Sequence, residues 1–129
     1  MTAETRPSTR ALRAALFREA TAIVTAELTR PITFAELSRR VATSPRQLRR
    51  VFGECGGTTF RSFLAEARMT RAAEHLTSTD MPVREVARLV GYREPSRFTK
   101  AFKRAYGLTP SQFRAAAASP EGNGSGHWS

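Results

Sequence analysis

Cysteine is nearly absent from this sequence of 129 residues, in which it occurs once, as Cys55. A single cysteine cannot form a disulfide within the chain, and this excludes the disulfide-stapled class of small secreted domains. Apolar runs are short as well, and none approaches the length of about 18 residues that a membrane-spanning helix needs. The N-terminal stretch MTAETRPSTR lacks the apolar segment of a secretory signal. Together these absences predict a protein of the reducing cytosol.

Residues that carry catalysis or bind metals are equally scarce. The two histidines are His75 and His127, and neither has metal-ligand spacing to the other or to Cys55. No nucleophile with a nearby base, no phosphate-binding glycine loop and no paired carboxylate motif can be identified. We interpret Cys55 as a small helix-end residue and His75 as structural or solvent-facing. The sequence therefore predicts a protein that is not an enzyme and that uses no cofactor or metal.

Acidic residues are the third scarcity, since 11 of them stand against 21 basic residues, of which 19 are arginine. Residues 31–116 hold 16 basic and 7 acidic side chains, a net charge of +9, so nearly all the excess lies in the segment expected to fold. An excess of this size suits a polyanion such as nucleic acid, or an acidic membrane surface. A solvated, arginine-rich surface has the same composition, so charge alone leaves these alternatives open.

Helical periodicity dominates the pattern that is present, and no alternating strand pattern appears. Capping residues and glycine or proline stops predict helices over residues 9–28, 34–41, 45–54, 59–76, 82–90 and 95–106, with a last short turn from Thr109. In the first helix, Leu12, Leu16, Ala20 and Ile23 are expected to form the buried face. The fold class is therefore predicted to be all-α.

An internal repeat gives this helical pattern its organisation. Residues 37–63 align with residues 86–113, at an offset of 49 before a tight turn and 50 after it. The aligned pairs are Leu37 and Val86, Val41 and Val90, Pro45 and Pro95, Leu48 and Phe98, Phe52 and Phe102, Gly57 and Gly107, Thr59 and Thr109, and Phe63 and Phe113. A short helix, a turn and a second capped helix thus occur twice, which predicts a duplicated helix-turn-helix.

The helix between the two repeats is predicted to connect them. Its first half places Phe60, Phe63, Leu64 and Ala67 on one side, and its second half places Met69, Ala72, Ala73 and Leu76 on nearly the opposite side. A helix with opposed apolar faces packs against two different bodies. The predicted domains are a disordered N-terminus (1–8), a first helix-turn-helix subdomain (9–58), a connector helix (59–78), a second subdomain (79–116) and a disordered tail (117–129).

The second helix of each repeat carries the candidate binding residues. In the first repeat Leu48, Val51 and Phe52 form the inward stripe, and in the second Phe98, Ala101 and Phe102 do so. The outward and flanking side chains are Arg46, Gln47, Arg49 and Arg50 in the first helix, and Ser96, Arg97, Thr99, Lys100, Lys103 and Arg104 in the second. Residues 46–53 and 96–106 contain no acidic side chain. Such a basic, hydrogen-bonding face suits the DNA major groove, where arginine binds guanine O6 and N7 in a bidentate way.

A family resemblance rests on these same residues. The stretch GYREPSRFTKAFKRAYGLTP at residues 91–110, followed by SQFR up to Arg114, resembles the signature of AraC/XylS-type regulators. Residues 48–52, Gly57, residues 63–64, residues 68–69 and Ala72 fit the family as well, so the resemblance covers residues 30–114. Two positions depart from the pattern: Ala42 stands where the family has a turn glycine, and Ser38 where it has alanine. Both departures predict slight strain in the first turn.

The resemblance implies how such a protein works. Two recognition helices enter successive major grooves on one face of double-stranded DNA, with base contacts from Arg46, Arg49, Arg50, Ser96, Arg97 and Lys100. Phosphate contacts are expected from Arg61, Lys103 and Arg104. The chain is similar to the short, stand-alone stress activators of multidrug and superoxide resistance, which act as monomers. It implies a bacterial, cytoplasmic activator at the nucleoid, with RNA polymerase as a further partner and no membrane partner.

Other interpretations stay open at this point. A nonspecific architectural protein shares the charge but binds scrambled DNA equally well, and a basic module that recruits another protein touches DNA only weakly. The DNA-binding half of a larger, effector-responsive regulator has the same motifs.

Overall fold

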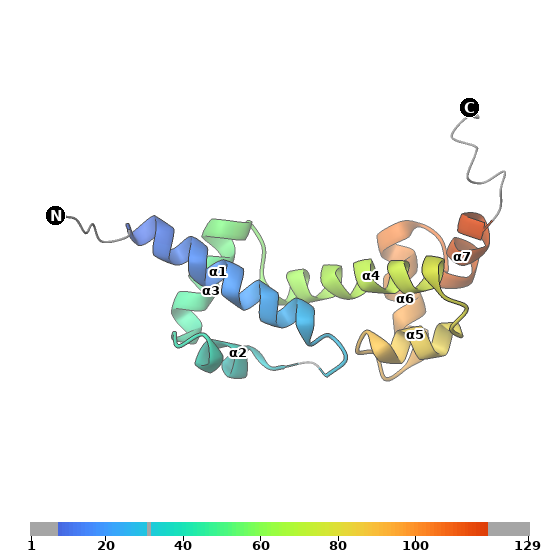
Figure 1. The fold of residues 1–129 in the computed structure, drawn as a ribbon, viewed down its shortest axis with the longest axis horizontal. Coiled ribbons are helices and arrows are strands. Elements are labelled where there is room, and N and C mark those ends of the chain that lie inside the picture. The colour runs from blue at the N-terminus through green and yellow to red at the C-terminus, as the bar shows by residue number, and fades with distance from the viewer. Residues whose placement is uncertain (1–7, 31, 119–129) are drawn as a thin grey trace, which may run out of the picture. The chain divides into compact units, whose positions relative to one another are not determined.

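A computed structural model of the protein describes residues 8–30 and 32–118, and this part contains seven helices and no strand (Figure 1). The helices are α1 (Thr9–Ala26), α2 (Phe34–Arg40), α3 (Pro45–Gly56), α4 (Phe60–Ser78), α5 (Val83–Leu89), α6 (Pro95–Tyr106) and α7 (Pro110–Ala118). The predicted all-α fold, with two helix-turn-helix motifs and a long helix between them, is confirmed. Among the described residues, none of the helices combines the length and apolar character of a membrane span.

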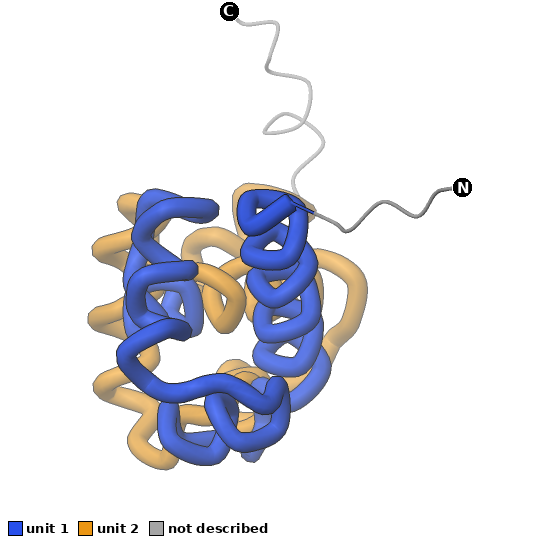
Figure 2. Tube along the Cα trace, turned by 90° about the vertical axis from the view of Figure 1, so that its left-hand side faces the viewer, with its two compact units in different colours: residues 1–65 blue, residues 66–129 orange. Residues whose placement is uncertain are grey.

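The chain divides into two compact units, residues 1–65 and residues 66–129, drawn in blue and orange in Figure 2. The division falls inside α4, whereas the sequence assigned this helix to a segment of its own. Two predicted boundaries are wrong. Ser8 was assigned to the disordered N-terminus, but its Oγ accepts a hydrogen bond from the Ala11 amide at 3.0 Å and caps α1. At the other end α7 continues to Ala118, because its alanines favour helix. The remainder of both predicted disordered segments lies outside the described residues.

Local capping explains where the helices of the first unit begin and end. Thr33 caps α2 by accepting from the Glu36 amide, and Ser44 caps α3 by accepting from the Gln47 amide at 3.1 Å. Pro45 takes the first helical position of α3, where its missing N–H costs nothing. α3 ends at Gly57, which has a φ of 59° in the left-handed region that glycine adopts without strain. The helix therefore runs two residues beyond the predicted end at residue 54.

The turn between the two helices of each motif has the same hydrogen bonds in both repeats. The Thr43 amide donates to the Ser38 carbonyl at 2.9 Å, and the Tyr92 amide donates to the Ala87 carbonyl at the same distance. One residue earlier the backbone has positive φ, 56° at Ala42 and 98° at Gly91. Ala42 thus adopts the conformation that the family fills with glycine, as the sequence predicted. Ser38 is buried, but its hydroxyl donates to the Phe34 carbonyl at 2.9 Å.

Each unit is built around the central phenylalanine of its recognition helix. In the first unit the ring of Phe52 lies 5.3 Å from Phe17 and 6.2–6.4 Å from Phe34, Phe60 and Phe63. These separations and tilts are those of favourable edge-to-face aromatic pairs. Leu48 and Val51 are buried beside Phe52, so the predicted inward stripe of α3 is confirmed.

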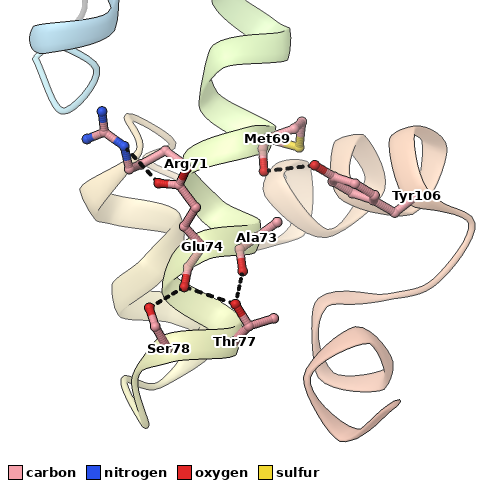
Figure 3. A network of polar contacts seen from close by, with 7 residues as sticks. All are labelled: Met69, Arg71, Ala73, Glu74, Thr77, Ser78 and Tyr106. Carbon is pink, nitrogen blue, oxygen red and sulfur yellow. Dashed lines mark hydrogen bonds and ion pairs between the residues drawn. The ribbon is translucent and has the colours of Figure 1, made fainter. Parts of the chain in front are cut away.

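In the second unit Phe102 is the central ring. It lies 5.8 Å from Phe98, 5.1 Å from Phe113 and 4.6 Å from Tyr106. Phe98 and Phe102 are fully buried, and Ala101 is half-buried. The Tyr106 hydroxyl donates to the Met69 carbonyl at 3.5 Å, which joins α6 to α4 (Figure 3).

The predicted buried face of α1 is wrong by about one position. Leu12 is 57% exposed and Leu16 and Ile23 are half-buried, while Ala20 and Val24 are buried. The reason is Phe17, whose ring inserts beside α3. A Cβ placed on Gly56 would lie 2.5 Å from Cζ of Phe17, so the absence of a side chain at residue 56 is what admits this ring. The repeat offset places Tyr106 at the position of Gly56, so the two units obtain their outer ring from different elements.

Side chains of the second unit form hydrogen bonds with backbone carbonyls at the C-terminal end of α4. The hydroxyls of Thr77 and Ser78 donate to carbonyls of the preceding turn, and Arg71 forms an ion pair with Glu74 (Figure 3). Arg114 of α7 donates from Nε to the Leu76 carbonyl at 3.0 Å and from Nη2 to the Thr79 carbonyl at 3.2 Å. Carbonyls that a helix end leaves unpaired are thereby satisfied.

Truncating either central ring should unfold or loosen its own unit. We expect Phe52→Ala and Phe102→Ala each to cost about 3–5 kcal/mol of unfolding free energy, because each leaves a cavity among four or three other rings. Chemical denaturation followed by circular dichroism measures the loss. Unchanged melting of either variant would contradict the burial of these rings.

Glycine at residue 42 should relieve the positive φ of the first turn. We expect Ala42→Gly to stabilise the protein by about 1 kcal/mol, because a left-handed conformation costs an L-residue roughly that much and Ala42 is exposed. Gly91→Ala is the reciprocal variant and should destabilise the second unit by a similar or larger amount. Equal denaturation midpoints for wild type and Ala42→Gly would show that the turn is unstrained.

Candidate nucleic-acid interface

The exposed face of α3 carries the four side chains predicted in the first unit. Arg46, Gln47, Arg49 and Arg50 are all exposed, and together they line a hollow on the surface. They are brought together because Leu48, Val51 and Phe52 fix the rotation of the helix in the core. The opposite face must then point to solvent. α3 therefore presents three guanidinium groups and one amide on a single surface.

These side chains differ in the interactions that they form within the protein. The Arg49 guanidinium lies over the Phe34 ring, with Cζ 5.6 Å from the ring centroid, within the range of a cation–π contact. Nε of Arg50 lies 3.4 Å from Oε2 of Glu54. Arg46 forms no ion pair with any residue that the structure describes. Its charge is therefore available to a ligand without exchange of a partner.

The exposed face of α6 is more strongly basic. Ser96, Arg97, Lys100, Lys103 and Arg104 are exposed, whereas Thr99, predicted to flank this face, is half-buried. Arg97 pairs with Glu94 at 3.4 Å, between its Nε and Oε1 of the carboxylate. Within residues 8–30 and 32–118, the two lysines and Arg104 have no acidic partner. α6 thus presents three uncompensated positive charges.

Arg61 belongs to neither recognition helix and lies in the first turn of α4. It is exposed and forms no ion pair within the described part of the chain. The repeat alignment places Ser111 at the equivalent position of α7, so this cation belongs to the first unit alone. The predicted site residues therefore fall into two exposed helix faces and one separate arginine.

Several of the arginines outside the recognition helices are paired with carboxylates in the described part of the chain. Arg40 donates from both terminal nitrogens to Glu27, at 2.8 and 2.6 Å, and this pairing lowers the pKa of the Glu27 carboxyl. Arg13 pairs with Glu54, and Arg88 pairs with Glu85. Because these carboxylates pair with arginines outside the recognition helices, the positive charge of the recognition faces remains largely uncompensated.

Two exposed residues, one beside each recognition face, were not identified from the sequence. Glu54 lies one position beyond the acid-free stretch 46–53, and its spacing of four residues from Arg50 was the signal that could have revealed the pair. Arg93 lies in the turn before α6 and is exposed without an ion pair in the described ranges. Arg93 lies in the turn where the repeat offset changes from 49 to 50. This one-residue difference between the repeats is the signal by which the sequence could have revealed it.

Cys55 and His75 show no sign of a reactive site. Cys55 is exposed at the end of α3, and His75 is half-buried on α4. Within the described part of the chain, no three histidine, cysteine or acidic side chains gather as metal ligands. His127, the other histidine considered from sequence, lies outside the described residues.

Known proteins resemble the chain over this same region. A helix-turn-helix domain family matches residues 37–116. An uncharacterised helix-turn-helix transcriptional regulator of Mycobacterium tuberculosis is 42% identical over 81 residues, which are 63% of this chain and 23% of that protein. The chain spans about a quarter of the length of the curated relatives that it matches first.

Two solved structures extend the comparison to the fold. A transcriptional regulator with an AraC-type DNA-binding domain from Chromobacterium violaceum is 25% identical, with a TM-score of 0.78 over 82% of this chain and 95% of that one. The DNA-binding domain of the global transcriptional factor AdpA, solved with a target DNA, is 29% identical, with a TM-score of 0.73 over 78% of this chain and 90% of that one. With the duplicated motif and its two basic faces, these matches show that the chain belongs to the AraC/XylS family of DNA-binding transcription regulators.

Proposed function

We propose that this chain binds one asymmetric promoter site as a monomer, with α3 and α6 in successive major grooves, and activates transcription from it. The observation that carries the proposal is that the two recognition helices share the register of their buried residues but differ in their exposed ones. Both bury the same register of apolar residues, yet their exposed side chains differ, arginine-rich on α3 and mixed serine, lysine and arginine on α6. Two helices that present different chemistry favour two different half-sites in one chain.

The contacts are divided by position on each helix. Base edges are met by Arg46, Arg49 and Arg50 of α3 and by Ser96, Arg97 and Lys100 of α6, with Gln47 and Thr99 beside them. Phosphates are met by Arg61, Lys103 and Arg104, and these contacts make binding fall as salt rises. Arginine with guanine is the commonest specific pair in the major groove, which favours guanine-containing half-sites for α3.

We propose activation rather than repression because the chain resembles the stand-alone stress activators. We propose that the protein acts in the bacterial cytoplasm, at the nucleoid, and that RNA polymerase is its second partner. Selection of bound fragments from a random DNA pool identifies the site, and a promoter reporter that carries this site measures the direction of regulation. Equal affinity for the selected and a scrambled duplex at fixed salt would instead identify a nonspecific architectural protein.

Single cations of each recognition face should matter for specific binding. We expect Arg50→Ala and Lys100→Ala each to weaken binding to the selected duplex by about 1–3 kcal/mol, the value of a good base contact. Titrations with duplexes altered at single base pairs locate the base that each residue meets. Arg18→Ala removes an exposed cation from α1 and is the matched control. Wild-type affinity and base preference in both variants would refute the assigned faces.

The complex should contain one protein chain on one asymmetric site. Two recognition helices already exist in the chain, so no partner protomer is needed to contact two segments about one helical turn (~34 Å) apart. Analytical ultracentrifugation on a short duplex gives the stoichiometry, and footprinting gives the two protected segments. A two-to-one complex on a symmetric site would contradict the proposal and direct attention to dimerisation through α1.

A further inference from the structure

Glu54 lies at the edge of the exposed face of α3, and it is the one acidic residue of that helix. Its carboxylate bridges two arginines. Oε1 accepts a hydrogen bond from Nη1 of Arg13 at 2.8 Å, and Oε2 lies 3.4 Å from Nε of Arg50. Arg13 belongs to α1, and Arg50 precedes Glu54 by one helical turn. The carboxylate therefore connects α1 to a side chain of the recognition face.

The two contacts of Glu54 have different roles. The short bond to Arg13 joins two charged groups and is the stronger, so it holds the carboxylate in place. The longer contact meets Arg50 on the Nε side of its guanidinium. A guanidinium has five donor hydrogens in a fixed planar fork, and a contact on its Nε side leaves the two hydrogens at the end of the fork, one on each terminal nitrogen, turned away from the carboxylate. Within the described part of the chain Arg50 forms an ion pair with no residue other than Glu54, and these two end hydrogens form the donor pair that matches guanine O6 and N7.

The second unit has the opposite charge at the equivalent place. The repeat offset of 50 aligns Glu54 with Arg104 and Arg50 with Lys100. Neither Lys100 nor Arg104 has an acidic partner within the described ranges, so α6 carries free cations where α3 carries a tethered one. A tethered arginine loses less side-chain freedom when it binds and is less available to arbitrary phosphates. The duplicated motif thus has one helix built for selectivity at this position and one built for attraction.

We propose that Glu54 is a specificity-determining positioning residue, which is held by Arg13 and orients the Arg50 guanidinium toward one base pair. Its negative charge also repels phosphates, so it weakens binding to wrong sites more than binding to the right one. This inference rests on the proposed function, since it requires that Arg50 meets a base. It assigns a part in site recognition to α1, which precedes the residues 37–116 matched by the family.

The substitution Glu54→Gln tests the inference directly. The protein is titrated against the selected duplex, its single-base-pair variants and a scrambled duplex at fixed salt. We expect Glu54→Gln to bind scrambled DNA more tightly and to reduce the ratio of scrambled to specific dissociation constants by about threefold to tenfold. The loss of preference should fall on the base pair that Arg50→Ala also affects. Glu19→Gln is the matched control, because Glu19 is exposed on α1 and has no ion pair within the described residues.

Two further variants separate positioning from simple charge. Arg13→Ala frees the carboxylate without removing it, and it should lower discrimination at the same base pair without tighter binding to scrambled DNA. Glu54→Gln in an Arg50→Ala background should produce no further change at that base pair, because the residue that it orients is gone. Melting curves of all the variants should match the wild type closely, since Glu54 and Arg13 are both partly exposed.

The outcomes distinguish this inference from the proposed function. An unchanged base preference in Glu54→Gln, or a change that Glu19→Gln reproduces, would overturn the role of Glu54 while specific binding through Arg50 stands. If Arg50→Ala itself retains the wild-type base preference, the assigned face of α3 is wrong, and the role of Glu54 is overturned with it.

Discussion

The burial of one phenylalanine in each recognition helix is the constraint on which the rest of this structure depends. Phe52 and Phe102 are each surrounded by other aromatic rings, and neither helix can rotate without exposing its ring or opening a cavity. Because the rotation is fixed, the side chains on the opposite face are fixed as well. The basic residues of α3 and α6 are therefore presented to solvent as a consequence of core packing, before any contact with DNA is made.

The two units solve the same packing problem with different residues. In the first unit Phe17 reaches the central ring from α1, and Gly56 leaves space for it. In the second unit Tyr106 supplies the ring from α6 itself and donates its hydroxyl to α4. Duplication thus preserved the turn and the buried register, which the backbone requires. It left the outer ring and the exposed face free to diverge, and this divergence is what favours a nonpalindromic site in the function that we propose.

The distribution of charge also differs between the structural part of the fold and the recognition helices. Ion pairs neutralise arginines that brace the fold, such as Arg40 with Glu27 and Arg88 with Glu85, while cations of α6 have no acidic partner among the residues that the structure describes. Glu54 is the exception, since its carboxylate reaches from a structural arginine to one on the recognition face. A DNA-binding protein needs attraction to phosphates for affinity, but this attraction must be limited if the protein is to be selective for one sequence. We propose that in this chain the two requirements are assigned to different helices.

The sequence by itself determined the helices, the repeat and, apart from Thr99, the residues of each exposed face. Apolar spacing, Ser44 before α3, Pro45 at its first position, and the glycines that cap α3 and α6 are local signals, and they act through the backbone of the same segment. Even the positive φ of Ala42 could be expected, because the second repeat has glycine there. Tertiary structure alone decided which face of α1 is buried, where Leu12 and Phe17 compete at nearly equal hydrophobicity and only the gap at Gly56 selects between them. It also decided that Glu54 meets Arg13 across a separation of 41 residues, since no periodicity within one helix encodes a contact made by another.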